Sequence, residues 1–395
     1  MGGAGGEGGI CDYHRMHAAS VSWIGSRYTS RMNFDTNLLH VLGWPDDARA
    51  RDDLAQALRE WPNASLGRVV AQHRSGYDVA TDLDTRIRAN APLPWTRARF
   101  PPEQRAAVGD WVLLDVDAAQ ILGLLPRRSL LARAAAGEHY RCQPIAANVD
   151  TVLVVTGLDR DFNPRRLERY LLLVQSSGAQ PVIVLTKADT GVDVEAAKAQ
   201  LQGMCEGGVP VFALNAKDPE ATRVLAPYLG AGQSVVLVGS SGAGKSTLTN
   251  TLLGRERMAT GAVRANDSRG RHTTTHRALL PLPHGGCLID TPGMREIKFT
   301  GEEAIDNSGF EDIQAAAARC RFRDCAHGSE PGCAVRAAID AGTLDPGHLA
   351  SYLKLSGELG GAAAQLALRQ AQRADARTQG KPTHKRGVDK YGRDR

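Results

Sequence analysis

Apolar residues follow two different patterns along this chain, and the pattern changes near residue 148. From Gly67 onward the apolar runs are short and rich in Val and aromatics: GRVVAQHRSGYDVAT, TRIRANAPL and VGDWVLLDV. SG and GD dipeptides punctuate them as turns do. Several short strands within about 80 residues predict a small barrel, of which the five-stranded oligonucleotide-binding (OB) barrel is the common kind. A barrel that serves only as a scaffold is the alternative.

Beyond residue 148, longer strand-like runs alternate with helical patterns. The strands are TVLVV, PVIVLTKAD, VPVFALNAK and QSVVLVGSSGAGKST, and Asn163 followed by Pro164 is typical of a helix cap and first turn. This alternation predicts a mostly parallel α/β sheet with helices on both faces. Ligands bind such sheets at the carboxyl ends of the strands, where the loops of these runs fall. Residues 1 to about 60 are expected to be irregular, with a disordered start.

Length, composition and charge narrow the class of protein. A chain of 395 residues suggests two or three domains. No apolar run approaches the roughly 20 residues that cross a bilayer, and no signal peptide is evident, so we expect a cytoplasmic protein without membrane contact. Residues 366–395 hold nine Lys or Arg against three Asp, so this tail has a net charge of +6. Because the whole chain has a net charge of +5, the residues before the tail sum to −1. The tail predicts a polyanionic partner, most simply nucleic acid; a merely solvated tail is the alternative.

The strongest local signal is a phosphate-binding loop between a predicted strand and a predicted helix. Gly239, Gly244, Lys245 and Ser246 fit the pattern G-x-x-x-x-G-K-[ST]. Backbone N–H groups at the helix start would surround phosphate oxygens, Lys245 would reach the β- and γ-phosphates, and Ser246 would ligate Mg²⁺. A chance Gly-rich turn is the alternative. The expected phosphate contacts are Gly239, Ser240, Ser241, Gly242, Ala243, Gly244, Lys245, Ser246 and Thr247.

A second loop, TKAD, selects the base. The Asp189 carboxylate can accept two hydrogen bonds from guanine, and adenine offers no such pair of donors. Lys187 can lay its alkyl stem across the base, next to Ala188, and Ala216 of LNAK can offer its N–H to the guanine keto oxygen. Thr186 stands where most GTPases have Asn. We expect it to lack the bonds that tie the base loop to the phosphate loop, which predicts weakened nucleotide affinity.

Two further loops complete the nucleotide chemistry. In GRHTTTHR, Thr274 can complete the Mg²⁺ coordination, while CLIDTPG offers Asp290 to the metal through water and the Gly293 N–H to the γ-phosphate. Met294 takes the place of a water-orienting glutamine, which predicts slow intrinsic hydrolysis. His272 is the nearest polar group that could position water; shaping the loop or touching RNA is the alternative. The residues expected to act in catalysis are Lys245, His272 and Thr274.

Cysteines crowd together near the C-terminus. Cys320, Cys325, His327 and Cys333 follow the spacing C-x4-C-x-H-x5-C, and three thiolates with one imidazole suit a closed tetrahedral zinc site. Such a site carries −1, which neighbouring arginines at 319, 321 and 323 could offset. Buried reduced cysteines are the alternative. The run HLASYLKLSGELGGAAAQLALRQAQR has helical spacing and leads into the basic tail.

The loops occur in the order base reader, phosphate loop, threonine loop, DTPG. Joining the usual GTPase termini and cutting the chain after DTPG gives this order and leaves the sheet intact, so the domain is expected to be circularly permuted. With a barrel before it and a Cys/His cluster after it, the chain resembles the ribosome small-subunit-dependent GTPase A family. The resemblance spans roughly residues 64–390 and includes VGDWV, LPRRSLLAR, ANVDTVLVV, GRHTTT and DTPG.

The resemblance implies both an architecture and an activity. The expected parts are an N-terminal extension (1–63), an OB-fold barrel (64–143), a circularly permuted P-loop GTPase domain (144–305), a mostly helical zinc-binding domain (306–365) and a basic tail (366–395). It implies a monomeric GTPase that uses GTP/GDP and Mg²⁺, holds one structural Zn²⁺ at the four positions above, contacts rRNA and acts late in small-subunit maturation. The alternatives are a metabolic P-loop kinase, which Asp189 disfavours, and an RNA-binding protein with structural nucleotide.

Overall fold

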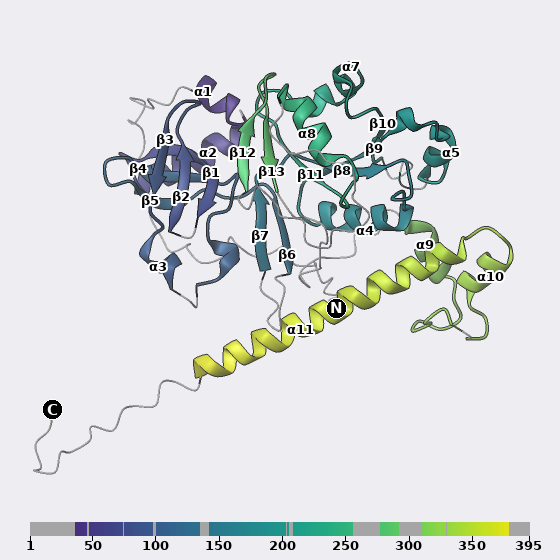
Figure 1. Cartoon of the computed structure of the whole chain (residues 1–395). Coiled ribbons are helices and arrows are strands. Elements are labelled where there is room, and N and C mark those ends of the chain that lie inside the picture. Colours follow the sequence, from purple (N-terminus) through teal and green to yellow (C-terminus); the bar gives the residue numbers. More distant parts are fainter. Residues whose placement is uncertain are drawn as a thin grey trace, which may run out of the picture. The chain divides into compact units, whose positions relative to one another are not determined.

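The structure is a computed structural model, shown in Figure 1, which describes residues 36–45, 47–73, 75–97, 100–134, 142–202, 204, 208–255, 277–291, 310–328 and 330–378. Within these ranges, every helix is too short or too polar to cross a membrane.

Two helices precede the first strand, α1 (Thr36–Val41) and α2 (Ala48–Glu60). Asp47 caps α2 by accepting a hydrogen bond from the Ala50 backbone N–H at 2.9 Å, and Ala50 and Leu54 are buried one turn apart. The expectation of irregular structure up to about residue 60 is therefore wrong for this segment. The apolar positions of ARARDDLAQALRE recur at helical spacing, and a polar cap precedes them.

Five strands then pair with one another in a ring. They are β1 (Ser65–His73), β2 (Gly76–Ala80), β3 (Arg86–Ala89), β4 (Trp111–Asp115) and β5 (Gln120–Leu124), with α3 (Leu93–Thr96) and the 3-10 turn η1 (Pro102–Gln104) between β3 and β4. The antiparallel pairs are β1–β2, β2–β3, β1–β4 and β4–β5, and a parallel bridge from Asn90 to Gln120 joins the end of β3 to β5. Val69, Val112 and Ile121 are buried within the ring. The predicted short strands are confirmed, and β5 was not predicted.

The second half of the sheet has the strand order β10-β9-β8-β11-β13-β12, and all its neighbours are parallel except β12 and β13. The strands are β8 (Thr151–Gly157), β9 (Gln180–Thr186), β10 (Val211–Ala213), β11 (Ser234–Val238), β12 (Ala278–Pro281) and β13 (Cys287–Asp290). The connecting elements are α4 (Pro164–Gln175), η2 (Ala188–Thr190), α5 (Val194–Ala199), α7 (Pro219–Thr222), η3 (Arg223–Tyr228) and α8 (Lys245–Leu253). Strands β8 and β11 are buried along their whole length, as their unbroken apolar runs predict. The predicted cap is confirmed, since the Asn163 side chain accepts from the Arg166 N–H at 3.2 Å.

The ring and the parallel sheet are joined through β12, which pairs with β1 at Ala278 and Ala71 (Figure 1). Beside this junction lies Arg68, whose side chain is fully buried. Its guanidinium donates to the backbone carbonyls of Gly109 and Asn148, both at 3.1 Å, and of Leu42. Burial lowers the pKa of Arg68, and the three carbonyl dipoles replace the water that the cation has lost. One side chain thus ties the N-terminal helices, the ring and the strand-β8 segment together.

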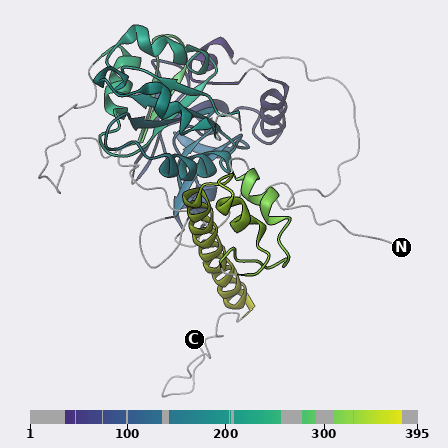
Figure 2. The same cartoon turned by 90° about the vertical axis from the view of Figure 1, so that its right-hand side faces the viewer.

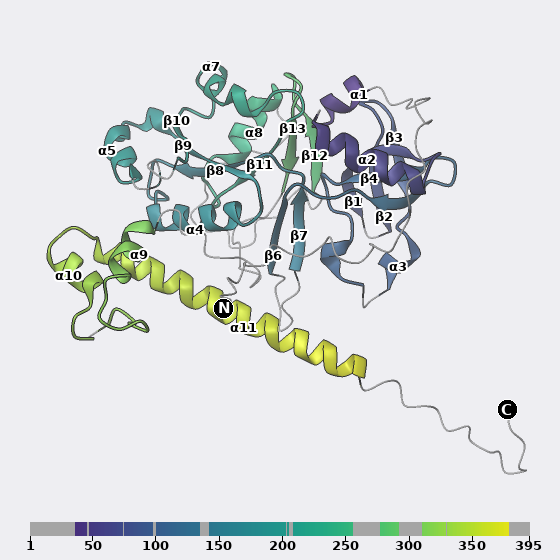
Figure 3. The same ribbon diagram turned by 180° about the vertical axis from the view of Figure 1, so that it is seen from behind.

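A separate two-stranded sheet consists of β6 (Leu130–Ala134) and β7 (Cys142–Ala147), which lie side by side in Figures 1 and 3. It is fastened to the strand after the threonine loop, because Arg277 donates to the Pro144 carbonyl at 2.8 Å. This hairpin was not predicted. The LPRRSLLAR segment, which contains most of β6, was recognised only by resemblance. The apolar positions of β6 and β7 are too few to predict a pair of strands.

The C-terminal part is helical, with α9 (Glu311–Ala317), α10 (Ala334–Asp340) and α11 (Pro346–Thr378). Phe310, Ile313 and Val335 are buried between these helices. The predicted helical spacing is confirmed by α11, which runs as one helix in Figures 1 and 2. His348, near its start, stacks on Phe310 with ring centroids 4.9 Å apart.

Candidate functional site

The predicted phosphate loop connects β11 to α8, as the pattern requires. Gly239, Gly242 and Gly244 all have positive φ, and a Cβ on Gly239 would lie 2.0 Å from the Val155 carbonyl oxygen. The loop can therefore close beside β8 only with glycine at that position. The Lys245 ammonium donates to the carbonyls of Gly239 (2.8 Å) and Ser240 (2.5 Å), so its charge lies within the loop. The local geometry is that of an anion cradle at a helix N-terminus.

The base loop approaches the phosphate loop through Thr186. Its side chain is fully buried and its hydroxyl donates to the Ala243 carbonyl at 2.6 Å, across 57 residues of sequence. The expectation that Thr186 leaves the two loops untied is therefore corrected, because a hydroxyl makes the connection in place of a carboxamide. A second tie runs from the other side, where the Thr251 hydroxyl of α8 donates to the Ala216 carbonyl at 2.7 Å.

We expect Thr186→Val to weaken nucleotide binding. The two side chains have nearly the same shape, but valine leaves the buried Ala243 carbonyl without its donor, at a cost of about 1–3 kcal/mol. Because the Ala243 carbonyl belongs to the phosphate loop, losing its donor should also disturb the geometry of that loop. Affinity for a fluorescent GTP analogue should therefore fall together with the free energy of unfolding in urea.

The matched control for Thr186→Val is Thr222→Val, since Thr222 is also buried and also donates to a carbonyl, that of Pro219 at 2.8 Å. This control should lose stability and keep nucleotide affinity. Unchanged affinity in Thr186→Val would show that the tie is dispensable for binding.

A third loop, between β8 and α4, contacts both nucleotide loops and was missed at the sequence level. Asp159 accepts from the ammonium of Lys187, the base-loop lysine, at 2.5 Å, and Lys187 itself has a left-handed backbone conformation with φ of 62°. Burial raises the pKa of Asp159, but Lys187 outweighs it and the net pKa is lowered. Asp161 accepts from the Ser240 hydroxyl of the phosphate loop and pairs with Arg166 at 2.5 Å. The only sequence signal was the position of these carboxylates at the carboxyl end of a predicted parallel strand.

The expected magnesium ligands that the structure describes come from adjacent elements. β11 and β13 are neighbouring parallel strands with Val236 opposite Ile289, so Asp290 ends its strand beside the strand that feeds the phosphate loop. Ser246 lies in the first turn of α8. Asp189, the expected guanine reader, is exposed at the end of the base loop. The remaining predicted residues of this site, His272, Thr274, Gly293 and Met294, lie outside the described residues.

The Cys/His cluster is assembled as predicted. The candidate ligand atoms of Cys320, Cys325, His327 and Cys333 all lie within 4.8 Å of one another. His327 Nδ1 is 3.5 Å from Cys333 Sγ and 3.7 Å from Cys320 Sγ, and the two sulfurs are 3.9 Å apart. Zn–S and Zn–N bonds of tetrahedral sites imply edges of roughly 3.6 Å for S–N and 3.8 Å for S–S. The donor set and its spacing therefore fit Zn²⁺.

The backbone around the cluster contributes to this fit. His327 has φ of 60°, a left-handed conformation that turns its side chain toward the thiols, and the Ala334 and Val335 N–H groups of α10 face Cys320. Although burial opposes it, these donors lower the pKa of Cys320. The pKa of Cys325 moves the other way, to about 11, because the His327 N–H that lowers it is outweighed by burial and the two neighbouring thiols.

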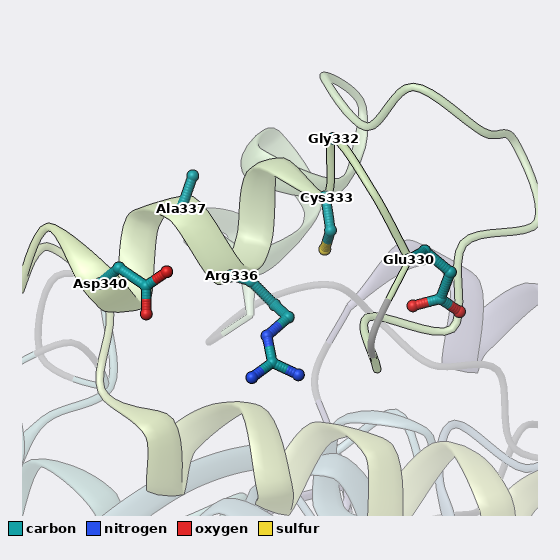
Figure 4. A pocket seen from close by; sticks show the side chains of 6 residues that line it. All are labelled: Glu330, Gly332, Cys333, Arg336, Ala337 and Asp340. Atoms are coloured by element: carbon teal, nitrogen blue, oxygen red, sulfur yellow. The ribbon is translucent and has the colours of Figure 1, made fainter.

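A pocket of about 510 Å³ adjoins the cluster and includes Cys333 in its lining. In the view of Figure 4 the Arg336 guanidinium projects into it between the carboxylates of Glu330 and Asp340. Arg336 also donates to the Gly328 carbonyl, in the loop that carries His327. Arg336 is thus a cation close to the cluster that sequence reasoning did not name. Arg321, which it did name, lies over the Phe322 ring with 5.6 Å to the centroid.

Comparisons with known proteins agree on one family. Residues 124–300 match the family described as RsgA GTPase. The small ribosomal subunit biogenesis GTPase RsgA of Xanthomonas axonopodis pv. citri (strain 306) is 57% identical over 362 residues, which is 91% of this chain and 98% of that protein. Its namesake in Xanthomonas euvesicatoria pv. vesicatoria (strain 85-10) is 56% identical with the same coverage.

Two solved structures share the fold. YjeQ from Thermotoga maritima superposes with a TM-score of 0.54 at 26% identity, covering 75% of this chain and 99% of that one. YloQ, described as a circularly permuted GTPase, gives a TM-score of 0.52 at 24% identity and covers 75% of this chain and 96% of that one. The permuted strand order deduced from the loop sequence is thus also that of a solved fold.

Proposed function

This chain belongs to the RsgA GTPase family, and we propose that it hydrolyses GTP when it is stimulated by the small ribosomal subunit, late in the maturation of that subunit. One observation carries the proposal: a base loop and a phosphate loop, far apart in sequence, are bonded directly through Thr186 and Ala243 at 2.6 Å. This hydrogen bond supports a single nucleotide site formed by the two predicted loops. Two relatives that are 57% and 56% identical to this chain are named small ribosomal subunit biogenesis GTPases.

In the proposed site, each residue has a stated role. Asp189 reads guanine, Lys187 lies along the base, and Ala216 meets the keto oxygen. The loop from Gly239 to Thr247 surrounds the phosphates, with Lys245 placed to neutralise charge that develops on the β–γ bridge. Ser246 and Asp290 would hold Mg²⁺, which when bound shields the β- and γ-phosphate oxygens. Thr274 would complete the Mg²⁺ coordination, the Gly293 N–H would meet the γ-phosphate, and His272 would position water.

The flanking parts are proposed to contact RNA. The ring order β1-β2-β3-β5-β4 supports an OB-type barrel, a fold that binds oligonucleotides. The Cys/His cluster supports one structural zinc, which would replace a large apolar core in a small helical segment. The basic tail after residue 366 would add phosphate contacts, which predicts steeply salt-dependent binding. A monomeric state and a cytoplasmic location are part of the same proposal.

The test compares GTP turnover by the purified chain alone, with small ribosomal subunits, and with large subunits as the control. Slow basal turnover that only small subunits accelerate is the expected result. Subunit affinity should be about 5- to 150-fold tighter with a non-hydrolysable GTP analogue than with GDP, the range of typical allosteric coupling. Turnover that small subunits leave unchanged would overturn the proposal, and equal affinities with both nucleotides would remove the switch.

A further inference from the structure

A basic groove of about 360 Å³ lies where α4 meets α11, away from the nucleotide loops. Arg165, Arg166 and Arg169 line it from α4, and Lys354 lines it from α11. Asn163 and Ser351 add an amide and a hydroxyl, and no lining residue is acidic. Figure 1 shows α4 beside the start of α11, so both walls are helical. A groove with four cations on two helices concentrates positive potential.

Two of the four cations already have partners at the edge of the groove. Arg166 pairs with Asp161 and Arg169 pairs with Glu358, each at 2.5 Å. Arg165 and Lys354 make no ion pair with any residue in the described part of the chain. The Asp345 carboxylate lies near Arg165, because the two approach the position of an added Gly347 Cβ to 3.0 Å and 1.7 Å. With four cations in its lining, the groove still keeps a net positive charge that an anion can neutralise.

The walls of the groove are fixed by contacts outside it. The Arg165 guanidinium lies against Gly347, where an added Cβ would come within 1.7 Å of its Nη2. His348 is placed between Glu168 of α4 at 3.2 Å and Asp312 of α9 at 3.3 Å. These contacts hold the first turns of α11 against α4, so the cations do not have to be assembled when a ligand arrives.

The groove is connected to the phosphate loop by two consecutive side-chain hydrogen bonds. Arg166 binds Asp161, and Asp161 accepts from the hydroxyl of Ser240 within the loop. A phosphate that enters the groove competes with Asp161 for the Arg166 guanidinium. Asp161 is then left with Ser240 alone, and the carboxylate gains freedom beside the nucleotide phosphates. A ligand at the groove and a nucleotide at the loop are thereby linked through one carboxylate.

We propose that this groove binds the phosphate backbone of an RNA strand and that its occupancy changes nucleotide affinity through Arg166 and Asp161. The proposal deepens the proposed function and rests on its RNA partner. Planar guanidiniums from one helix and an ammonium from another match phosphates repeated along a strand. The helix that supplies Lys354 also carries the first residues of the tail of charge +6, so the groove and the tail are parts of the same C-terminal segment.

The binding test uses the full chain and a fluorescein-labelled 20-base-pair RNA duplex, followed by anisotropy over a range of salt. Arg165→Gln/Lys354→Gln should weaken binding roughly tenfold or more near 0.1 M salt, and flatten the log–log salt slope by about two. Lys354→Gln alone, which changes an exposed residue, should flatten it by about one. The control Lys198→Gln/Arg223→Gln removes two exposed charges paired with Glu195 and Glu220 and should leave the slope unchanged.

Equal slopes for the groove variants and the control would overturn the groove assignment. Displacement of the RNA by poly-glutamate at matched charge would instead assign the groove to an acidic protein and overturn the RNA proposal. Thermal unfolding of each variant shows whether the fold is kept.

The coupling test measures affinity for a fluorescent GTP analogue with and without the same duplex. The wild type should change its affinity when RNA is added, and Asp161→Asn, which can still accept from Ser240 but cannot pair with Arg166 as an ion, should lose this change and keep RNA binding. An equal response in both proteins, or none in the wild type, would refute the path through Asp161. Neither test uses ribosomal subunits, so a failure of subunit-stimulated turnover would strike the proposed function and leave these results standing.

Discussion

Asp189→Asn is expected to abolish tight GTP binding and to create affinity for xanthosine triphosphate. The carboxylate would accept two hydrogen bonds from guanine, and losing partners of this kind costs about 1–3 kcal/mol each. The combined loss of several kcal/mol corresponds to roughly 100-fold or more in dissociation constant. Xanthine presents a keto oxygen where guanine has its amino group, so the Asn amide can donate to it. Dissociation constants of the wild type and the variant for GTP, XTP and ATP test this change in base selectivity.

The structure explains why this substitution should act on the base and not on the fold. Asp189 is exposed and makes no hydrogen bond to another described residue, whereas its neighbours hold the loop through backbone contacts such as Ala188 N–H to the Leu214 carbonyl at 3.4 Å. The matched control is Asp193→Asn, four residues on, where the side chain caps α5 by accepting from Ala196 at 3.0 Å. It should leave nucleotide choice intact. A wild type that binds ATP as tightly as GTP would show that Asp189 does not read the base.

The elements that the sequence predicted well are those whose burial is set by local pattern. A strand covered on both faces has to be apolar throughout, so β8, β9 and β11 appear as continuous runs, and a cap such as Asn163 acts on its own first turn. The phosphate loop is local for the same reason, since its glycines are needed within one turn of chain. The Cys/His cluster spans only 14 residues, so its ligand spacing alone predicts that the four side chains come together.

The features that were missed depend on partners distant in sequence. Thr186 was judged by comparison with asparagine, but the carbonyl that satisfies its hydroxyl belongs to Ala243, which no spacing rule connects to it. Asp161 is one charge in a polar loop until Ser240 and Arg166 are seen around it. Arg68 looks like an ordinary strand residue, yet it is buried because three carbonyls from different segments converge on it. The roles of these residues follow from tertiary contacts and cannot be read from local propensity.

Removing one ligand of the Cys/His cluster is expected to have the other large effect. Structural zinc contributes apparent free energies of about 10–16 kcal/mol in zinc-finger peptides, and a site that loses a thiolate retains little of this. Cys325→Ser should therefore release the metal and loosen residues 310–345, where few apolar side chains besides Phe310, Ile313 and Val335 are buried. Zinc content by elemental analysis and limited proteolysis of the C-terminal region would report the two effects. Protein purified without chelator that contains no zinc would remove the claim.

Nucleotide binding should survive in Cys325→Ser, and this is what separates a structural metal from one that serves the nucleotide site. The loops that would hold GTP extend from β8, β9, β11 and β13, all within residues 151–291, and their core is complete without the helical segment. Cys142→Ser, which changes a cysteine on β7 outside the cluster, is the matched control and should keep both zinc and nucleotide. Among the described residues, one contact between the two parts is that of α11 with α4, where His348 meets Glu168 at 3.2 Å. If GTP affinity fell together with zinc content, the contacts between α11 and α4 would have to carry far more of the stability of the nucleotide site than one His–Glu pair supplies.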